Sequence, residues 1–396
     1  MTVNPLDTPD FDTPINRRGT LCQKWDGAAN YFDVSGPDAL PMWVADTDFK
    51  APPVVLEALQ ALVDHGVFGY TGDDGPYLKA IQWWMGERHG WQVDTDWILT
   101  TFGIVNAIGI ALDTFTEPGD GILVFAPVYH AFGRIIEASG RRMVEAPLAL
   151  ENGRYVLDLD QAAALLDGVK VVLWCSPHNP GGRVWTAEEN AAVAAMAEQH
   201  DLLLISDEIH QDLVFDGHVH RPMALTEGIE KRLITLNATS KTFNLAGHHT
   251  GNTIIADPAL RRAFTSRLRA LGLSSNVAGI RAATAAYSPR GAAWLDAQIR
   301  YLERNRQTFD KAINAIPGLT SMPLESTYLA WVDFSGTGMS PDEIRARVEK
   351  TANIAANRGE TFGMGGASFM RFNLGTQHAN IEDATRRLTA AFSDLQ

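Results

Sequence analysis

The hydrophobic pattern in the middle of the chain alternates between short apolar runs and amphipathic helical segments. Five runs are nearly continuous in apolar residues, at 97–101, 121–127, 170–177, 201–208 and 232–241. Such runs are typical of parallel strands covered by helices on both faces, because neither side of the strand meets water. Between two of them, Thr186 and Glu189 form a capping-box pattern that predicts a helix through about His200. The pattern predicts an α/β fold with a mixed, mainly parallel sheet and flanking helices.

The regions on either side of this core have different patterns. The first fifty residues are rich in Asp, Pro and Gly without a useful period, which predicts an extended arm. Later in the chain, a long charged helix is expected to lead into strands of a smaller α+β unit, at 292–316, 327–334 and 369–375 respectively. We therefore expect an N-terminal arm that joins the small domain, a large domain and a small C-terminal α+β domain, at 1–50, 51–288 and 289–396.

The composition narrows the classes of partner. The chain has 47 acidic and 33 basic residues, a net charge of −14, which disfavours nucleic acid as a partner. Its apolar runs are far shorter than the roughly 20 residues of a membrane helix, and its beginning lacks a signal-peptide pattern. Cys22 and Cys175 are too few for a disulfide framework and lack metal-ligand spacing. We expect a soluble cytoplasmic protein without membrane, nucleic-acid or metal partners.

Polar and aromatic residues follow the predicted strands, at the edge of the sheet where α/β proteins bind ligands. Gly103 precedes a predicted helix, whose first backbone amides could bind a phosphate; a tight turn explains this glycine equally well. Tyr129 could stack on a flat heteroaromatic ligand, although an isolated tyrosine is more often a core residue. Asn179 offers an amide to a ligand hydroxyl or phenolate, and it could equally be a turn former.

An acid and an amine follow the last two strands of the series. Asp207 emerges from a buried strand and needs a cationic or proton-bearing partner. Lys241 stands at the end of the next strand, where an amine could be desolvated and reactive. By itself such a lysine is usually a surface charge. Together with the phosphate, stacking and amide candidates, however, the two residues describe a pyridoxal-phosphate site, since that cofactor needs a lysine for its aldehyde and an acid for its ring nitrogen.

Ordered segments along nearly the whole chain resemble fold-type I, aminotransferase-like pyridoxal-phosphate enzymes. They are RRGTLCQKWD (17–26), MWVADTDF (42–49), HGVFGYT (65–71), APVYHAF (126–132), CSPHNPGGRVW (175–185), ISDEIHQDLVF (205–215), SKTFNLAG (240–247), STYLAW (326–331) and RFNLG (371–375). The phrases KWD, FGYT and SDEIH are similar to the MalY/PatB-type branch of cystathionine β-lyases and cysteine C–S lyases. The resemblance implies a large domain that binds pyridoxal 5'-phosphate.

The resemblance also implies roles for individual residues. Lys241 would form the Schiff base with the cofactor and later remove the α-proton of the substrate. Asp207 would keep the ring nitrogen protonated, while Tyr129 would stack on the ring. Asn179 would hydrogen-bond the phenolate oxygen, and Arg371 would clamp the substrate α-carboxylate. Tyr129 and Asn179 would also contact the substrate.

The phosphate site implied by the resemblance needs two subunits. Its ligands would be the backbone amides of Gly103 and Ile104, the side chain of Thr239 or Ser240, and Tyr70 of a second subunit, so a homodimer is expected. Two positions depart from aspartate-type aminotransferases. His210 stands where those enzymes have a tyrosine on the phenolate oxygen, as is usual in the lyase branch, and would contact the cofactor. His249 replaces the Arg or Lys that many relatives place on the phosphate.

The implied reaction is α,β-elimination at a carbon–sulfur bond. L-Cystathionine or related cysteine S-conjugates would give a thiol, pyruvate and ammonia. The sequence motifs do not indicate which substrate side chain is preferred. An aminotransferase of the same fold is the alternative enzyme, because it would use the same lysine and acid. A regulatory protein with residual lyase activity is a third hypothesis, although intact Lys241, Asp207 and Arg371 argue against a loss of catalysis.

Overall fold

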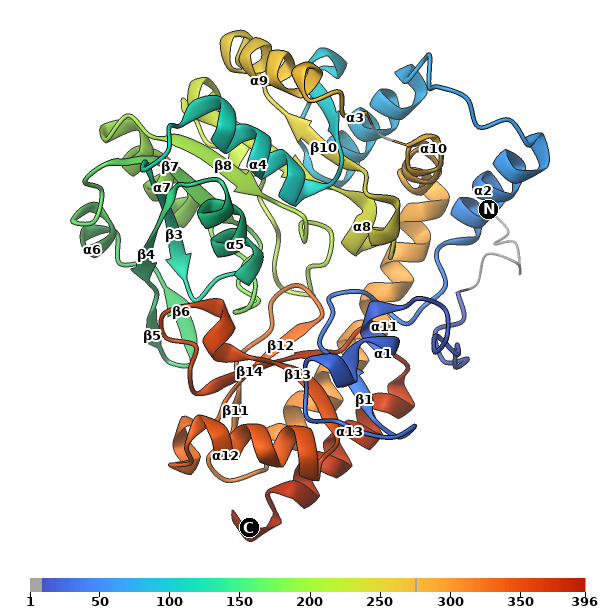
Figure 1. Ribbon diagram of the computed structural model, residues 1–396, viewed down its shortest axis with the longest axis vertical. Coiled ribbons are helices and arrows are strands. Elements are labelled where there is room, and N and C mark those ends of the chain that lie inside the picture. Colours follow the sequence, from blue (N-terminus) through green and yellow to red (C-terminus); the bar gives the residue numbers. More distant parts are fainter. Residues whose placement is uncertain (1–8, 275, 396) are drawn as a thin grey trace.

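A seven-stranded sheet forms the centre of the computed structural model, which describes residues 9–274 and 276–395 (Figure 1). Its order is β2 (Ile98–Thr101), β10 (Gly251–Ile254), β9 (Leu233–Asn237), β8 (Leu203–Asp207), β7 (Val169–Cys175), β3 (Gly121–Ala126) and β4 (Arg142–Pro147). β10 is antiparallel to both its neighbours, and the pairs from β9 to β4 are parallel. The prediction of a mainly parallel α/β sheet is confirmed.

Helices cover both faces of this sheet because successive strand residues are buried on opposite sides. In β3, Ile122 and Val124 pack in one hydrophobic cluster, while Leu123 and Phe125 pack in another. The helices of this part are α2 (Pro53–His65), α3 (Gly75–His89), α4 (Ile104–Phe115), α5 (His130–Ala138), α6 (Leu159–Ala163), α7 (Ala187–Gln199), α8 (Thr239–Thr242), α9 (Pro258–Ala270) and α10 (Val277–Ala286). The predicted capping box begins α7, where Thr186 and Glu189 bond each other's backbone amides.

A second, five-stranded sheet lies beside the first (Figure 1). Its order is β1 (Leu40–Met42), β13 (Ile354–Arg358), β14 (Phe369–Asn373), β12 (Leu329–Asp333) and β11 (Thr320–Ser321). The long helix α11 (Pro289–Ile313) packs against α13 (His378–Ala391), and the short α12 (Pro341–Arg345) belongs to the same part of the chain. A separate hairpin consists of β5 (Ala149–Glu151) and β6 (Arg154–Val156).

The N-terminal segment has more structure than an extended arm. It contains a helical turn, α1 (Gln23–Asp26), and its strand β1 pairs in parallel with β13, far away in the sequence. The blue segment therefore lies among the orange and red C-terminal elements in Figure 1. The division at residues 50 and 288 stays a prediction. Among the described helices, none has the length and apolar character needed to span a bilayer.

Candidate active site

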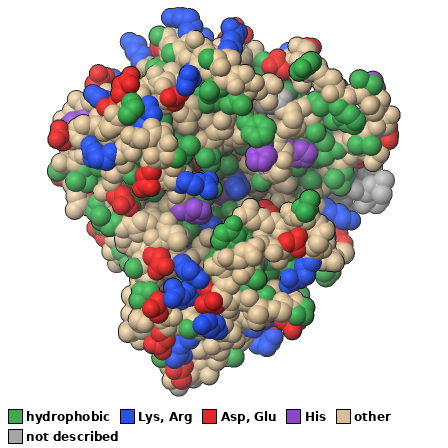
Figure 2. Space-filling model, in the orientation of Figure 1, with side chains coloured by type: hydrophobic (Ala, Val, Ile, Leu, Met, Phe, Trp, Pro, Cys, Tyr) green, Lys and Arg blue, Asp and Glu red, His purple; other side chains and the backbone are tan. Residues whose placement is uncertain are grey.

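A cavity of about 330 Å³ opens at the carboxyl ends of the central strands, where ligands of open α/β sheets bind. Several residues predicted from the sequence line it, namely Gly103, Ile104, Tyr129, Asn179, Asp207, His210, Ser240 and Lys241. Ala45, from the N-terminal segment, contributes to the wall as well. Figure 2 shows a hollow in the middle of the molecule, with basic and histidine side chains around it. The fold thus gathers side chains that are widely separated in the sequence.

The start of α4 has the properties of an anion site. Residues 103–106 all line the cavity, so the first backbone amides of a twelve-residue helix are beside it. Gly103 precedes the helix with φ +86°, a left-handed conformation that disfavours any residue with a Cβ. The helix dipole and unpaired amides favour a negatively charged group at this place. The turn that Gly103 makes is therefore also the turn that exposes these amides to the cavity, and phosphate binding there stays a prediction.

Asp207 ends β8 and is a buried carboxyl group that forms no ion pair with any of the residues that the structure describes. Its Oδ1 accepts a hydrogen bond of 3.1 Å from the backbone amide of Ile209. Burial raises the pKa of Asp207 to about 7, although that hydrogen bond and the charge of Lys241 act in the opposite direction. A protonated heteroaromatic nitrogen beside this carboxyl group would offset the cost of burying it.

The amine of Lys241 lies in α8, immediately after β9. Its Nζ donates a hydrogen bond of 2.7 Å to the backbone oxygen of Ala45. Burial lowers the pKa of Lys241 to about 8, and the positive charge of Arg371 acts in the same direction. A large fraction of this lysine is consequently a neutral nucleophile near pH 8, unlike an ordinary lysine.

The lowered pKa predicts how capture of pyridoxal phosphate depends on pH. In cofactor-free protein, the rate of capture at Lys241, quenched with borohydride, should rise as the amine loses its proton and level off above about pH 8. The measurement is the amount of reduced adduct on the Lys241 peptide at each pH, with Lys241→Ala as the blank. A rate that keeps rising toward the ordinary lysine value of 10.5 would contradict the desolvated amine.

Arg371 is a buried guanidinium without a carboxylate partner in the described part of the chain. It donates hydrogen bonds to Oδ1 of Asn179 at 2.9 Å, to the oxygen of Trp43 at 3.0 Å and to Oδ1 of Asn357 at 2.8 Å. Its Nε has no hydrogen-bond partner, and burial lowers the pKa of Arg371 to about 10. A buried positive charge held by neutral acceptors favours a carboxylate ligand.

We expect Arg371→Ala to weaken binding of amino-acid substrates by about 100-fold, the scale of a lost charge-assisted pair. Affinity for pyridoxal phosphate should stay within a few-fold, because Arg371 does not line the cavity itself. Substrate KM and fluorescence titration of the cofactor measure the two effects separately. Equal loss of both affinities would mean that Arg371 has a structural role.

Tyr129 and His210 complete the walls of the cavity. Tyr129 is the N-cap residue of α5, and burial raises the pKa of its phenol. Burial lowers the pKa of His210 well below its usual value, so its ring is neutral near pH 7. Its Nδ1 is buried and has no hydrogen-bond partner among the described residues, as expected where a ligand atom completes the site. His249 is exposed and stacks on Phe102 at a centroid distance of 4.9 Å.

Two of the predicted phosphate ligands, Thr239 and Tyr70, do not line the cavity. Thr239 begins α8 and is buried, but it does not line the cavity, whereas its neighbour Ser240 does. The side chain of Tyr70 is fully exposed and is absent from the cavity wall. Val67 and Phe68 are exposed in the same segment, at 65% and 63%. The role of Tyr70 across a homodimer interface therefore stays a prediction.

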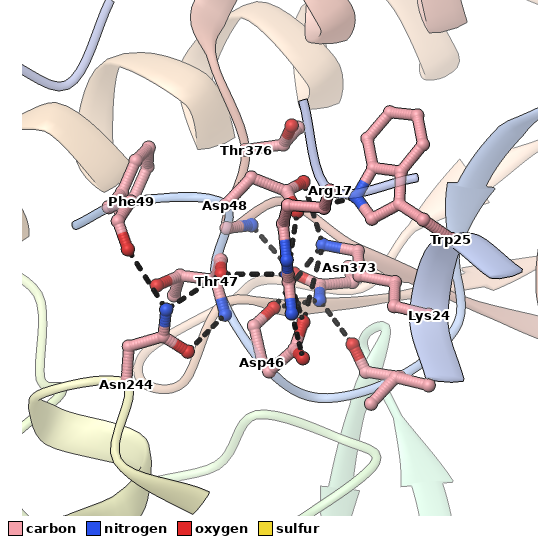
Figure 3. A network of polar contacts seen from close by, with 12 residues as sticks. Arg17, Lys24, Trp25, Asp46, Thr47, Asp48, Phe49, Asn244, Asn373 and Thr376 are labelled. Carbon is pink, nitrogen blue, oxygen red and sulfur yellow. Dashed lines mark hydrogen bonds and ion pairs between the residues drawn. The ribbon is translucent and has the colours of Figure 1, made fainter. Parts of the chain in front are cut away.

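A cluster of charged residues holds the N-terminal segment that borders the site (Figure 3). The sequence patterns assigned no role to these residues. Asp48 accepts bonds from Lys24 at 2.9 Å and from Arg17 at 2.8 Å, while Arg17 also pairs with Asp46 at 2.8 Å. Lys24 and Asp48 are almost completely buried. Their segments, 17–26 and 42–49, contributed only motifs of the family resemblance. The opposite charges within these two segments were the one feature that could have indicated an ion-pair cluster.

This charged cluster is joined to the segments that hold the lysine and the guanidinium. Asn244, three residues after Lys241, bonds the backbone of Thr47 in both directions and also donates to the oxygen of Phe49. Asn373, two residues after Arg371, donates to the backbone oxygens of Val44 and Asp46. These bonds fix segment 43–49 between the segment that carries Lys241 and the strand that carries Arg371 (Figure 3).

A second group of buried polar residues contacts Thr242, the residue that follows Lys241. Asp212 accepts hydrogen bonds from Thr242 at 2.7 Å and from Trp84 at 2.9 Å, and it pairs with His89 at 2.7 Å. These partners lower the pKa of Asp212 against the opposing effect of burial. Because Thr242 is next to Lys241, Asp212 fixes the turn that carries the amine. Nothing in the sequence pattern distinguished Asp212 from other acidic residues.

The residues around the cavity fit pyridoxal phosphate. The start of α4 suits its phosphate, Tyr129 suits its flat ring, and Asp207 suits its ring nitrogen. The partly deprotonated Lys241 suits its aldehyde, and Asn179 and the unpartnered His210 are beside the same cavity. These roles remain predictions for the individual residues.

Comparison with known proteins places this geometry in a family. Residues 42–388 match the family described as aminotransferase class I and II. The chain is 39% identical to cystathionine beta-lyase PatB of Bacillus subtilis, covering 97% of this chain and all of that protein. It is 32% identical to protein MalY of Escherichia coli, covering 96% of this chain and 98% of that protein.

A solved structure shares the fold over its whole length. Cystalysin from Treponema denticola, which contains a pyridoxal 5'-phosphate cofactor, matches with a TM-score of 0.94 and 35% identity. The match covers 98% of this chain and 100% of cystalysin. The resemblance that the sequence motifs indicated is confirmed. The chain therefore belongs to the class I and II aminotransferase family, with the fold-type I architecture of pyridoxal-phosphate enzymes.

Proposed function

We propose that this protein is a pyridoxal-phosphate-dependent carbon–sulfur β-lyase. It would cleave L-cystathionine or related cysteine S-conjugates to a thiol, pyruvate and ammonia by α,β-elimination. The observation that carries this proposal is one cavity with a desolvated amine, Lys241, and a buried acid, Asp207, beside a buried guanidinium without a carboxylate partner. The names of PatB and of the C–S lyases with solved structures support the same class of reaction.

The cofactor would be held by the residues described above. The first turn of α4 and Ser240 would bind its phosphate, Asp207 its ring nitrogen, and Tyr129 one face of its ring. When bound, pyridoxal phosphate supplies an electron sink that stabilises negative charge at the substrate Cα. The buried carboxyl group of Asp207 would hold the ring nitrogen in its protonated form.

The protein's own residues would then direct the reaction at the substrate. Arg371, held in place by Asn179 and Asn357, would fix the α-carboxylate. The neutral amine of Lys241 would remove the proton from Cα, since its pKa of about 8 suits a base at physiological pH. Loss of that proton and of the thiolate from Cβ, followed by addition of water and loss of ammonia, gives pyruvate.

Transamination uses the same lysine and acid, so products must separate the two reactions. We expect the purified holoenzyme to release free thiol, pyruvate and ammonia in equal amounts from L-cystathionine. Thiol reagent, lactate dehydrogenase coupling and an ammonia assay measure the three products. Keto acid formed only in the presence of an acceptor keto acid, without thiol release, would establish an aminotransferase instead.

We further propose a cytoplasmic homodimer in which Tyr70 reaches the partner's phosphate site. The exposed side chains of Val67, Phe68 and Tyr70 support it, because apolar groups in one exposed segment are typical of an interface. Sedimentation of the holoenzyme tests the dimer. A monomer at working concentrations with full activity would contradict it.

A further inference from the structure

One charged residue of the cavity wall has no part in the chemistry proposed above. The acidic, basic and histidine side chains that line the cavity are Arg134, Asp207, His210, Lys241 and His249. Asp207 and Lys241 face the cofactor's ring nitrogen and aldehyde in the proposed function, and His210 is a neutral ring. His249 stacks on Phe102. Arg134 remains, and it is a permanent positive charge at any physiological pH.

Arg134 lies on α5, about one turn after the start of that helix. Tyr129 is the N-cap of α5 and His130 its first residue, so Arg134 follows His130 at the i+4 position on one helix face. The positive charge of Arg134 acts on both neighbours, since it contributes to lowering the pKa of His130, which burial brings to about 4. His130 is therefore neutral near pH 7 and leaves Arg134 as the cation of this face.

Arg134 is also free to bind a ligand. Within the described residues it makes no hydrogen bond or ion pair, and its side chain is exposed while lining the cavity. Many other arginines of this acidic chain are engaged by carboxylates; Arg17, Arg183, Arg347 and Arg358 are examples. The carboxyl group that shares the cavity, Asp207, is buried at the end of β8. A guanidinium at the rim is thus available for a carboxylate that enters with the substrate.

The cavity consequently has two separate guanidinium groups beside it. Arg371 is buried and held by Asn179, whereas Arg134 is exposed on α5. Both guanidinium groups act on the phenol of Tyr129, which lines the cavity, so a substrate whose α-carboxylate binds Arg371 would have its sulfur substituent within reach of Arg134. We propose that Arg134 selects cysteine S-conjugates whose sulfur substituent carries a carboxylate, by pairing with that distal group. This inference rests on the proposed lyase function and specifies its substrate class.

The test compares two substrates that differ only in the charge of the distal group. S-(2-carboxyethyl)-L-cysteine has a distal carboxylate, and S-(2-carbamoylethyl)-L-cysteine replaces it with an amide of nearly the same shape. For the wild-type holoenzyme we expect kcat/KM to favour the carboxylate about ten-fold, the scale of a charge-assisted pair that water partly screens. Arg134→Gln should reduce this ratio to about one, and Arg134→Glu should invert it.

A matched control isolates the position of the charge. Arg262 is an exposed arginine of α9 that lines a different hollow and, like Arg134, has no hydrogen bond or ion pair within the described residues. Arg262→Gln removes the same charge from the chain and should keep the ten-fold preference. In Arg134→Gln the rate with the amide substrate should fall less than the rate with the carboxylate substrate, because the amide carries no charge for Arg134 to pair with.

Binding of an unreactive ligand gives a readout that needs no turnover. 3,3'-Thiodipropionate has two carboxylates but no amine, and its monoamide has only one carboxylate. Calorimetric titration of the holoenzyme should show tighter binding of the diacid, and Arg134→Gln should remove the difference. Fluorescence titration of pyridoxal phosphate should give the same affinity in wild type and variant.

The outcomes separate this inference from the proposed function. Thiol release at equal rates from both substrates, unaffected by Arg134→Gln, would overturn the role of Arg134 and leave the lyase intact. A diacid preference in calorimetry without thiol release from any substrate would support Arg134 and overturn the lyase. Equal loss of both substrates together with weaker cofactor binding would make Arg134 a cofactor or structural residue, which contradicts the inference.

Discussion

Lys241→Ala is expected to lower thiol and pyruvate release by at least about 1,000-fold, because the variant loses both the base and the covalent attachment point of the cofactor. The amine lies beside Ala45 at the end of β9, and its lowered pKa of about 8 makes it reactive. Product assays under saturating substrate measure the loss. In the wild type, borohydride reduction should fix the cofactor on the Lys241 peptide, and in the variant it should leave no adduct.

Two controls make this result specific to the position. Lys231→Ala removes an exposed lysine from η5 (Ile229–Arg232), a turn before β9, and should retain full activity and the adduct. A small primary amine added to Lys241→Ala should restore part of the rate, since it can occupy the space left by the side chain. An adduct on another lysine, or wild-type rates in Lys241→Ala, would refute the assignment of the Schiff-base residue.

Asp48→Ala is expected to cost about 3 to 5 kcal/mol of the free energy of unfolding, the range for breaking a buried ion pair. Asp48 accepts bonds from Lys24, Arg17 and Trp25, and its removal leaves the fully buried ammonium of Lys24 with Asp46 at 3.7 Å. Urea unfolding followed by fluorescence measures the change. Activity should fall as well, because segment 43–49 bonds Asn244 and Asn373 beside the site.

An exposed carboxylate provides the matched control for this stability effect. Asp201 pairs with Arg232 at 3.3 Å with its own side chain 98% exposed, so Asp201→Ala should cost less than about 1 kcal/mol. Lys24 and Arg17 lower the pKa of Asp48, so its contribution is present above the ordinary value of 3.8 and is lost as the pH falls through the lowered value. Similar losses for Asp48→Ala and Asp201→Ala would show that the buried cluster does not stabilise the fold.

The central sheet shows where sequence patterns succeed and where they stop. The five nearly continuous apolar runs correspond to β2, β3, β7, β8 and β9, because strands buried on both faces must be apolar throughout. The pattern did not predict β10, whose Asn252 and Thr253 are buried through hydrogen bonds to other strands. A polar strand of this kind is stable only next to its partners, which a local pattern cannot reveal.

The N-terminal segment illustrates the same limit. Its Asp, Pro and Gly content predicted an extended arm that joins the small domain, but it did not predict strand β1, which pairs with β13 more than 300 positions away. Lys24 and Asp48 are charged residues that local hydrophobicity places in water. They are buried because each offsets the other's desolvation, and that compensation exists only once both segments are docked.

The sequence by itself determined the α/β class, the positions of five main strands along the chain and the residues at their carboxyl ends, because hydrophobic periodicity and strand-end position are local properties. Its motifs also determined the family, since many ordered segments recur together. Only the tertiary structure decided which groups share one cavity, which pKa values are shifted, and which arginines are paired. Arg371 and Asn179 are 192 positions apart. Within the described residues Arg134 makes no hydrogen bond or ion pair, whereas Arg17 and Arg358 pair with carboxylates. Cavity membership, pKa shifts and ion pairing depend on burial and on distances between charges, which arise only when remote segments pack together.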